Sequence, residues 1–228
     1  MDEKAGSLYD FGPLAAGYDR WYDGPLGKMY DRMEKEAVAK LLPPAGRGER
    51  LLEVGCGTGH WSAWFGSLGY EVTGVDISAE MVEVARARGP AGCTFQVADA
   101  RRLPFDDASF DVVAAMATLE FVTDAEAVVK EMFRCVKPTG RVVVGTLNRD
   151  APLNRNRVEQ GNEPYASARL LSPIELKRLL EPYGRVRMRV AVKESQHRWL
   201  KRLRELRELL TLSWGRSKAV FLAAEVHT

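Results

Sequence analysis

Short runs rich in apolar residues alternate along the chain with segments of helical periodicity. The runs have strand length and lie at residues 51–54, 71–76, 94–98, 109–116 and 141–147. Between most of them, apolar residues recur every three or four positions, the spacing of a helix with one buried face. The run at 109–116 is apolar at nearly every position, as in a central parallel strand covered on both faces. The alternation therefore predicts an α/β fold with a mostly parallel sheet and helices on both faces.

The first 44 residues depart from this alternation and are expected to form a cap over the sheet. Residues 8–24 are rich in Gly, Tyr and Trp, and a helix with one apolar face follows them. Pro43 and Pro44 stop this helix just before the first strand.

Beyond residue 147 the chain contains a long connection, a helix and a predicted hairpin. Residues 148–170 are rich in Asn and Arg and too many for a simple connection, which favours a substrate loop at the carboxyl edge of the sheet. The sequence Ser-Pro-Ile-Glu at 172–175 begins a helix with a capping box. Strands at 185–192 and 218–226 are expected to pair antiparallel. A turn is expected earlier, at 137–140, where the sequence is Lys-Pro-Thr-Gly.

Residues 197–212 lie between the strands of this hairpin and have the periodicity of an inserted amphipathic helix. Its apolar residues fall on one side: Trp199, Leu200, Leu203, Leu206, Leu209 and Leu210. Three interpretations stay open for that side. It could pack on the core or on the N-terminal cap, rest on an anionic membrane surface, or contact a second subunit.

A glycine-rich turn follows the first strand. Residues 53–59 have the sequence Glu-Val-Gly-Cys-Gly-Thr-Gly, with glycines at alternate positions where they would destabilise a strand or a helix. The pattern predicts positive φ angles or a ligand close to the main chain. The dinucleotide fingerprint Gly-x-Gly-x-x-Gly would need a glycine at position 60, which is His60.

An acidic residue ends the second strand. Asp76 follows Gly55 by about twenty residues, the distance at which a Rossmann-type β-α-β unit places the acid that binds ribose hydroxyls. Asp76 could instead cap the next helix. The glycine turn before it favours the ribose interpretation.

The glycine spacing, with an acid two residues before the first glycine, resembles motif I of the class I S-adenosylmethionine (SAM) dependent methyltransferases. Residues 50–150 together resemble the Methyltransferase-11 group, which includes enzymes of the ubiquinone and menaquinone biosynthesis type. The resemblance implies a Rossmann-like sheet of seven strands with one antiparallel strand. It also implies a methyltransferase for a small molecule, with SAM as cofactor and S-adenosylhomocysteine as product.

The resemblance carries cofactor-binding residues over to this chain. In the family, the Asp-Ala pair after the third strand meets adenine, which assigns that role to Asp99 and Ala100. Tyr18, from the Tyr-Asp pair in the cap, would lie nearest the methionine end. The further candidates are Glu53, Gly55, Cys56, Gly57, Gly59, Asp76, Ile77, Met81 and Met116.

Composition agrees with a single globular domain. The chain has 228 residues, of which 46% are hydrophobic and 28% charged. We divide it into a cap at 1–44, a cofactor-binding core at 45–147 and a substrate-side region at 148–228. No run approaches the roughly 18 apolar residues of a membrane span, and the N-terminus lacks an apolar signal core. A cytoplasmic location is therefore expected.

Charge and cysteine usage exclude several functions. The three cysteines are widely spaced, which argues against a disulfide framework and against a metal site. The net charge of +2 gives no general attraction to nucleic acid, so a nucleic-acid partner is not expected. Residues 185–218, however, contain eleven Lys or Arg and three acids.

The expected chemistry places few demands on the protein. Methyl transfer from a sulfonium is an in-line displacement, so alignment of donor and acceptor is the main task. A hydroxyl, thiol or acidic carbon acceptor would also need a base near the methyl group. Glu120, just after the strand at 109–116, is the first candidate, and His60 is the second, although His60 also suits packing or capping at the start of a helix.

Two alternatives from other classes stay open. A regulatory module could bind SAM without transferring the methyl group, and a nicotinamide-dependent oxidoreductase would rest on the glycine turn alone. Within the methyltransferase interpretation, the acceptor atom could be O, N or C, and the oligomeric state is open.

Overall fold

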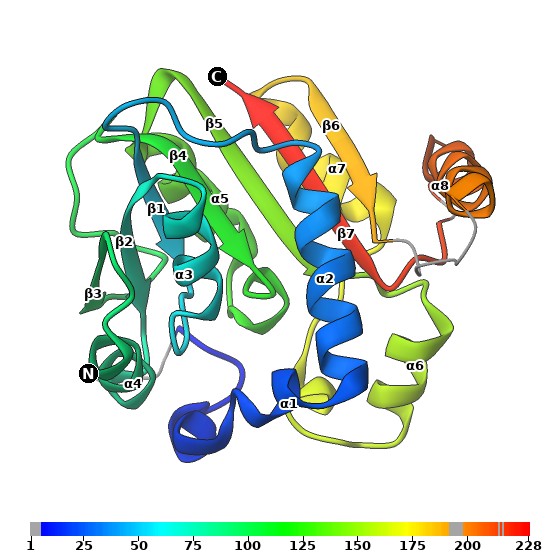
Figure 1. Ribbon diagram of the computed structural model, residues 1–228, viewed down its shortest axis with the longest axis horizontal. Coiled ribbons are helices and arrows are strands. Elements are labelled where there is room, and N and C mark those ends of the chain that lie inside the picture. Colours follow the sequence, from blue (N-terminus) through cyan, green and yellow to red (C-terminus); the bar gives the residue numbers. More distant parts are fainter. Residues whose placement is uncertain (1–5, 192–197, 214, 216) are drawn as a thin grey trace.

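A seven-stranded sheet forms the centre of the molecule (Figure 1). The computed structural model describes residues 6–191, 198–213, 215 and 217–228. The strands are β1 Arg50–Val54, β2 Glu71–Asp76, β3 Cys93–Val97, β4 Phe110–Met116, β5 Val136–Leu147, β6 Val186–Val190 and β7 Phe221–His227. They lie in the order β3-β2-β1-β4-β5-β7-β6, and β7 runs antiparallel to both of its neighbours. The predicted seven-stranded sheet with one reversed strand is confirmed.

Helices cover both faces of this sheet. They are α1 Arg20–Asp23, α2 Pro25–Ala39, α3 His60–Ser67, α4 Ala79–Arg88, α5 Ala125–Cys135, α6 Pro152–Glu159, α7 Pro173–Leu180 and α8 Arg198–Ser213. Short 3-10 turns occur as η1 Gly12–Gly17, η2 Leu119–Phe121, η3 Tyr165–Ser167 and η4 Glu181–Tyr183. No helix in the described ranges is long and apolar enough to cross a membrane.

Neighbouring residues of the central strands pack into different cores. Leu51 of β1 belongs to a cluster with Val38 of α2 and Phe65 of α3. The next residue, Leu52, belongs to a cluster with Val128 of α5 and with residues of α7. Since side chains alternate between the faces of a strand, α2 and α3 cover one face and α5 and α7 cover the other. This arrangement is the physical reason why these strands are apolar at nearly every position.

Side-chain caps fix where several helices begin. Ser172 accepts a hydrogen bond from the backbone N–H of Glu175, and the Glu175 carboxylate accepts one from the backbone N–H of Ser172. The predicted capping box is therefore present. Ser78 and Asp124 cap α4 and α5 by accepting from backbone N–H groups three residues ahead.

Two segments differ from the sequence prediction. The residues expected to form a turn, 137–140, lie inside β5. Val136 pairs with Phe110 and Arg141 pairs with Val112, so β5 has more residues between these two pairs than β4 has. The intervening residues form an irregularity in the strand rather than a turn before it. The connection at 148–170 is also more ordered than expected, since it contains α6 and η3.

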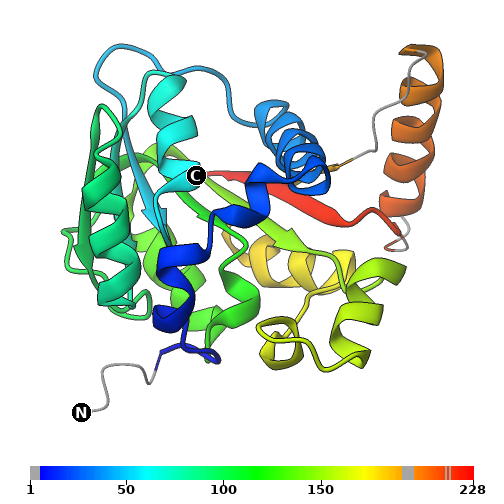
Figure 2. The ribbon, with the colours of Figure 1, turned by 60° about the horizontal axis from the view of Figure 1, so that its bottom comes forward.

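The predicted inserted helix exists as α8, but its apolar side is not in the core. Figures 1 and 2 both show α8 at the periphery, beyond the edge of the sheet formed by β6. Leu203, Leu206 and Leu210 are 53%, 57% and 66% exposed. Of the three interpretations left open for the apolar side, packing on the core therefore does not apply to these three leucines, and Leu212 packs against the core instead. Residues 192 and 197, where the strand and helix predictions ended and began, lie outside the described residues.

Candidate active site

The glycine turn after β1 follows a path that suits glycine. Gly55, Gly57 and Gly59 have φ angles of 72°, 52° and 79°, in the left-handed region that other residues rarely adopt. The backbone N–H groups of Gly55 and Cys56 both donate to the carbonyl oxygen of Val75, at 2.7 and 2.9 Å. The turn is therefore fixed to the end of β2 as it passes from β1 to α3.

Asp76, the last residue of β2, joins the glycine turn to the start of α4. Its Oδ2 accepts from the backbone N–H of Gly57 at 2.8 Å, and its Oδ1 accepts from that of Ser78 at 2.9 Å. Burial raises the pKa of Asp76, and these backbone hydrogen bonds oppose that rise. The N-cap of α4 is Ser78 and not Asp76, so Asp76 does not have the alternative role of helix cap. Its carboxylate lines the cavity described next.

One cavity gathers nearly all of the residues expected to bind the cofactor. It is lined by Tyr18, Glu53, Gly55, Cys56, Gly57, Asp76, Ile77, Met81, Asp99, Ala100 and Met116. Gly59 and Glu120 do not line it. A Cβ on Gly59 would lie 3.0 Å from the ring of Phe95, so this glycine allows close packing behind the turn.

The N-terminal segment lines the cavity and is hydrogen-bonded to the body of the protein at two places. The backbone N–H of Leu8 donates to the carbonyl of Phe121 at 2.6 Å, just after β4. Asp19, between η1 and α1, accepts from the Thr58 hydroxyl at 2.8 Å and forms a close ion pair with Arg88 of α4. The predicted cap therefore contacts the glycine turn directly.

Two half-buried tyrosines of the cap, Tyr18 and Tyr22, line the cavity. Burial, followed by neighbouring acidic groups, raises the pKa of the Tyr18 and Tyr22 hydroxyls above the ordinary range, so both stay neutral. The ring of Tyr22 stacks on His60, with centroids 3.8 Å apart and planes 3° from parallel. Both residues line the cavity.

His60 is held by a charged pair on α2. Its Nε2 lies 2.7 Å from Oδ1 of Asp31 and 3.1 Å from Nζ of Lys35, which also donates to Asp31. Burial raises the pKa of Asp31, but hydrogen bonds from His60 and Lys35 outweigh it and hold that pKa below its ordinary value. No hydrogen bond involves Nδ1 of His60 among the described residues, so this atom can serve a ligand.

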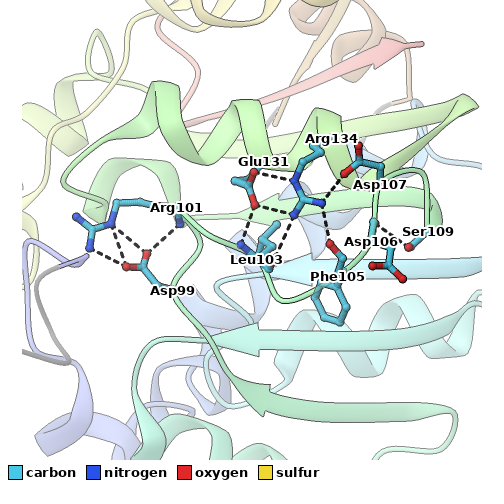
Figure 3. Close-up of polar contacts among 9 residues, drawn as sticks. All are labelled: Asp99, Arg101, Leu103, Phe105, Asp106, Asp107, Ser109, Glu131 and Arg134. Carbon is cyan, nitrogen blue, oxygen red and sulfur yellow. Dashed lines mark hydrogen bonds and ion pairs between the residues drawn. The ribbon is translucent and has the colours of Figure 1, made fainter. Parts of the chain in front are cut away.

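The opposite end of the cavity is bordered by Asp99 and Ala100, after β3. Figure 3 shows the guanidinium of Arg101 against the Asp99 carboxylate, with Nη2 and Oδ2 2.7 Å apart. These hydrogen bonds hold the pKa of Asp99 below its ordinary value. Further along, Arg134 of α5 donates to the carbonyls of residues 103 and 105 and pairs with Glu131 (Figure 3). This network fixes the loop that follows Ala100.

Glu120 lies in η2, where its side chain is fully buried. Its oxygens accept from the backbone N–H of Leu147 and from the hydroxyl of Thr146, both at 3.0 Å. Burial raises the pKa of Glu120 to about 7, against these hydrogen bonds. The carboxylate thus joins η2 to the end of β5.

Sequence reasoning missed Thr118 as a residue of the site. Thr118 lines the cavity, and its hydroxyl donates to the carbonyls of Met116 and Val54 at 3.1 and 3.2 Å. An ideal Cβ on Gly55 would lie 2.2 Å from Thr118 Cγ2. The first glycine therefore gives room to Thr118, a long-range contact that the local spacing of the motif does not reveal.

Candidate metal ligands do not gather in the described part of the chain. No group of three or more His, Cys, Asp or Glu side chains there could hold a metal ion. The three cysteines are free thiols in this structure.

The fold and the cavity together define the class of the protein. A glycine turn of this spacing after β1, with an acid at the end of the neighbouring β2, is the arrangement expected of the class I methyltransferases.

Comparisons with known proteins agree with this class. A family model described as "Methyltransferase domain" matches residues 52–144. The O-methyltransferase cnsE of Penicillium expansum is 35% identical over 195 residues, covering 80% of this chain and 69% of that protein. A solved SAM-dependent methyltransferase from Thermotoga maritima, a possible histamine N-methyltransferase, has a TM-score of 0.72 and 26% identity, covering 95% of this chain and 97% of that one. The chain belongs to the Methyltransferase-11 group of SAM-dependent methyltransferases, and its cofactor is SAM.

Gly55 and Gly48 have nearly the same φ angle, so comparing them tests the steric role of Gly55 in the turn. We expect Gly55→Ala (φ 72°) to lose about 1–3 kcal/mol more stability than Gly48→Ala (φ 73°), because only the first introduces a clash, with Thr118. Both variants bear the similar strain of a left-handed alanine. Urea unfolding measures the difference, and equal losses would contradict the steric role of Gly55.

Glu53 makes stability depend on pH. Burial raises the pKa of its carboxyl to about 8 despite a hydrogen bond from Ser62, whereas its ordinary value is 4.5. The folded protein therefore holds the Glu53 proton more tightly than the unfolded chain does. The stability that this difference contributes is fully present below about pH 4.5 and is lost as the pH rises through 8. Between pH 5 and 8, we expect the free energy of unfolding to fall by on the order of 1–3 kcal/mol more than in Glu53→Gln. The exposed Glu71→Gln variant should show the same pH dependence as the unmodified protein. If the free energy of unfolding of Glu53→Gln also changed with pH as in the unmodified protein, the raised pKa of Glu53 would be refuted.

Proposed function

We propose that this enzyme transfers the methyl group of SAM to an oxygen of a small molecule that binds beneath the N-terminal cap. The observation that carries the proposal is that Asp99, Ala100, Asp76, Tyr18 and His60 all line one cavity. The name of the relative cnsE, an O-methyltransferase, supports oxygen as the acceptor atom.

Each part of the cofactor has a proposed partner in the cavity. Adenine would lie against Asp99 and Ala100, the ribose hydroxyls would donate to Asp76, and the methionine end would face Tyr18. The acceptor oxygen must then approach the sulfonium in line with the bond that breaks. The apolar residues proposed to border the cofactor are Ile77, Met81 and Met116.

His60 is the better placed of the two candidate bases. It lines the cavity and keeps Nδ1 free, while Asp31 orients the ring through Nε2. Glu120 does not line the cavity, and its side chain is fully buried. We therefore propose that His60 takes the acceptor proton and that Glu120 positions η2.

The remaining proposals concern the chain as a whole. The segments 1–44, 45–147 and 148–228 would act as one methyltransferase domain in the cytoplasm, without a nucleic-acid partner. A peripheral membrane contact through α8 would add to this function without being needed for it.

Thermal unfolding with S-adenosylhomocysteine, SAM and NADH tests the cofactor site. At 100 times its dissociation constant a ligand adds about 2.7 kcal/mol, and each kcal/mol moves the midpoint by about 2–4 °C. We expect a shift with both adenosyl ligands and none with NADH. Asp76→Ala should weaken S-adenosylhomocysteine about tenfold to a hundredfold by removing hydrogen bonds to a charged group. The exposed Asp106→Ala is the matched control, and equal affinities of the two variants would remove Asp76 from the site.

A second measurement separates the two candidate bases. Phenols, catechols, carboxylic acids and amines are screened for release of S-adenosylhomocysteine, and the variants are assayed with the acceptor found. We expect His60→Gln to lower kcat about a hundredfold while its affinity for S-adenosylhomocysteine is unchanged. Glu120→Gln should keep most of its turnover. A large loss of kcat in Glu120→Gln alone would reverse the assignment.

A further inference from the structure

The outward side of α8 is a stripe of exposed leucines. Leu203, Leu206 and Leu210 recur at helical spacing and expose more than half of their surface. They contrast with the other large apolar residues of the chain, most of which are buried in the two main cores. We call these three residues the leucine stripe.

Arginines lie on both sides of the leucine stripe. At about 100° per residue, Arg202 lies about 40° beyond Leu206 on one flank of the stripe, and Arg207 lies about 40° beyond Leu203 on the other. Arg204 lies about 100° from Leu203, toward the inward side. All three arginines are exposed. The outward side of α8 therefore combines apolar and cationic groups.

The two acids of α8 are used on its inward side. Glu205 forms a close ion pair with Lys40, which follows α2. Glu208 accepts from the hydroxyl of Ser217 at 2.7 Å and from the backbone N–H of Lys218 at 3.2 Å. Glu205 and Glu208 lie three and four residues from Arg202 and Arg204, but among the described residues no ion pair joins either acid to these arginines.

The leucine stripe does not hold α8 in place. Leu212, about half a turn of the helix away from the stripe, packs against the main core, and α8 lies beside β6. The inward contacts of Glu205 and Glu208 complete the attachment. The exposed leucines therefore stay available for a binding partner.

We infer that this side of α8 binds an anionic lipid surface, with the leucine stripe among the acyl chains and the arginines at the phosphates. A helix with an exposed apolar stripe flanked by cations is suited to the membrane interface. A second copy of the chain fits less well, because a symmetric contact would bring the arginines of the two copies together. The inference stands independently of the acceptor proposed above.

The position of α8 gives this contact a functional consequence. β6 runs parallel to β5, because both are antiparallel to β7, and α8 follows the carboxyl end of β6. The glycine turn and the cavity lie at the carboxyl ends of β1 and β2. Because α8 lies beyond β6, at the other side of the sheet from β1 and β2, lipid contact through α8 would leave the cavity uncovered by the bilayer.

Vesicle cosedimentation tests the inference on the full chain. We expect binding to vesicles of equal parts phosphatidylcholine and phosphatidylglycerol, little binding to phosphatidylcholine alone, and release by added salt. Replacing the leucine stripe by serine should weaken binding at least about tenfold. Each of Arg202→Gln and Arg207→Gln should weaken it about fivefold, and Arg204→Gln, nearer the inward side, should weaken it less. Leu26→Ser is the matched control, because Leu26 is 61% exposed on α2.

Sedimentation equilibrium and S-adenosylhomocysteine binding are measured on the same preparations. Unmodified protein that binds S-adenosylhomocysteine but no anionic vesicles would overturn the lipid contact and leave the cofactor assignment intact. A dimer lost on serine replacement, without vesicle binding, would assign the stripe to a second copy. Failure to bind S-adenosylhomocysteine with normal vesicle binding would count against the cofactor site alone.

Discussion

The carboxylate of Asp76 is the interaction on which the site depends. It accepts from the backbone of Gly57 and of Ser78, so it fixes the glycine turn and the start of α4 at once. Three glycines with positive φ make this compact path possible, and the path lets Thr118 approach Gly55. The space between the turn, β2 and the cap is the cavity in which we propose that SAM binds. A single buried acid thus couples the local geometry of two loops to the shape of one binding site.

The sequence predicts the parts of the structure that depend on local rules. Alternating periodicity predicts the order of strands and helices along the chain. The capping box at Ser172 predicts the exact residue at which α7 begins. The distance from Gly55 to Asp76 places both at one edge of adjacent parallel strands, and there they contact the same cavity. Such predictions succeed because spacing along the chain determines position within a β-α-β unit.

Other features depend on contacts between distant segments, and the sequence alone does not reveal them. A helical period shows that α8 is amphipathic, but it does not say whether Leu203 or Leu212 faces the protein. The position of Glu120 after β4 suggests access to the site, whereas its bonds to β5 close it off. The pair formed by His60 and Asp31 joins α3 to α2 across 29 residues of sequence. In each case a tertiary partner decides the role of the side chain.

The charges around the cavity suit a reaction that consumes a cation. SAM carries a positive sulfonium that becomes neutral on transfer, so unpaired anions beside it would stabilise the substrate more than the transition state. Here the pKa of Glu53 is raised to about 8 by burial, and Arg101 pairs with Asp99. Asp76 is turned toward backbone N–H groups. These acids thus order the loops around the cavity. Because each is protonated, paired or hydrogen-bonded, they leave little free negative charge to stabilise the positively charged methyl donor before transfer.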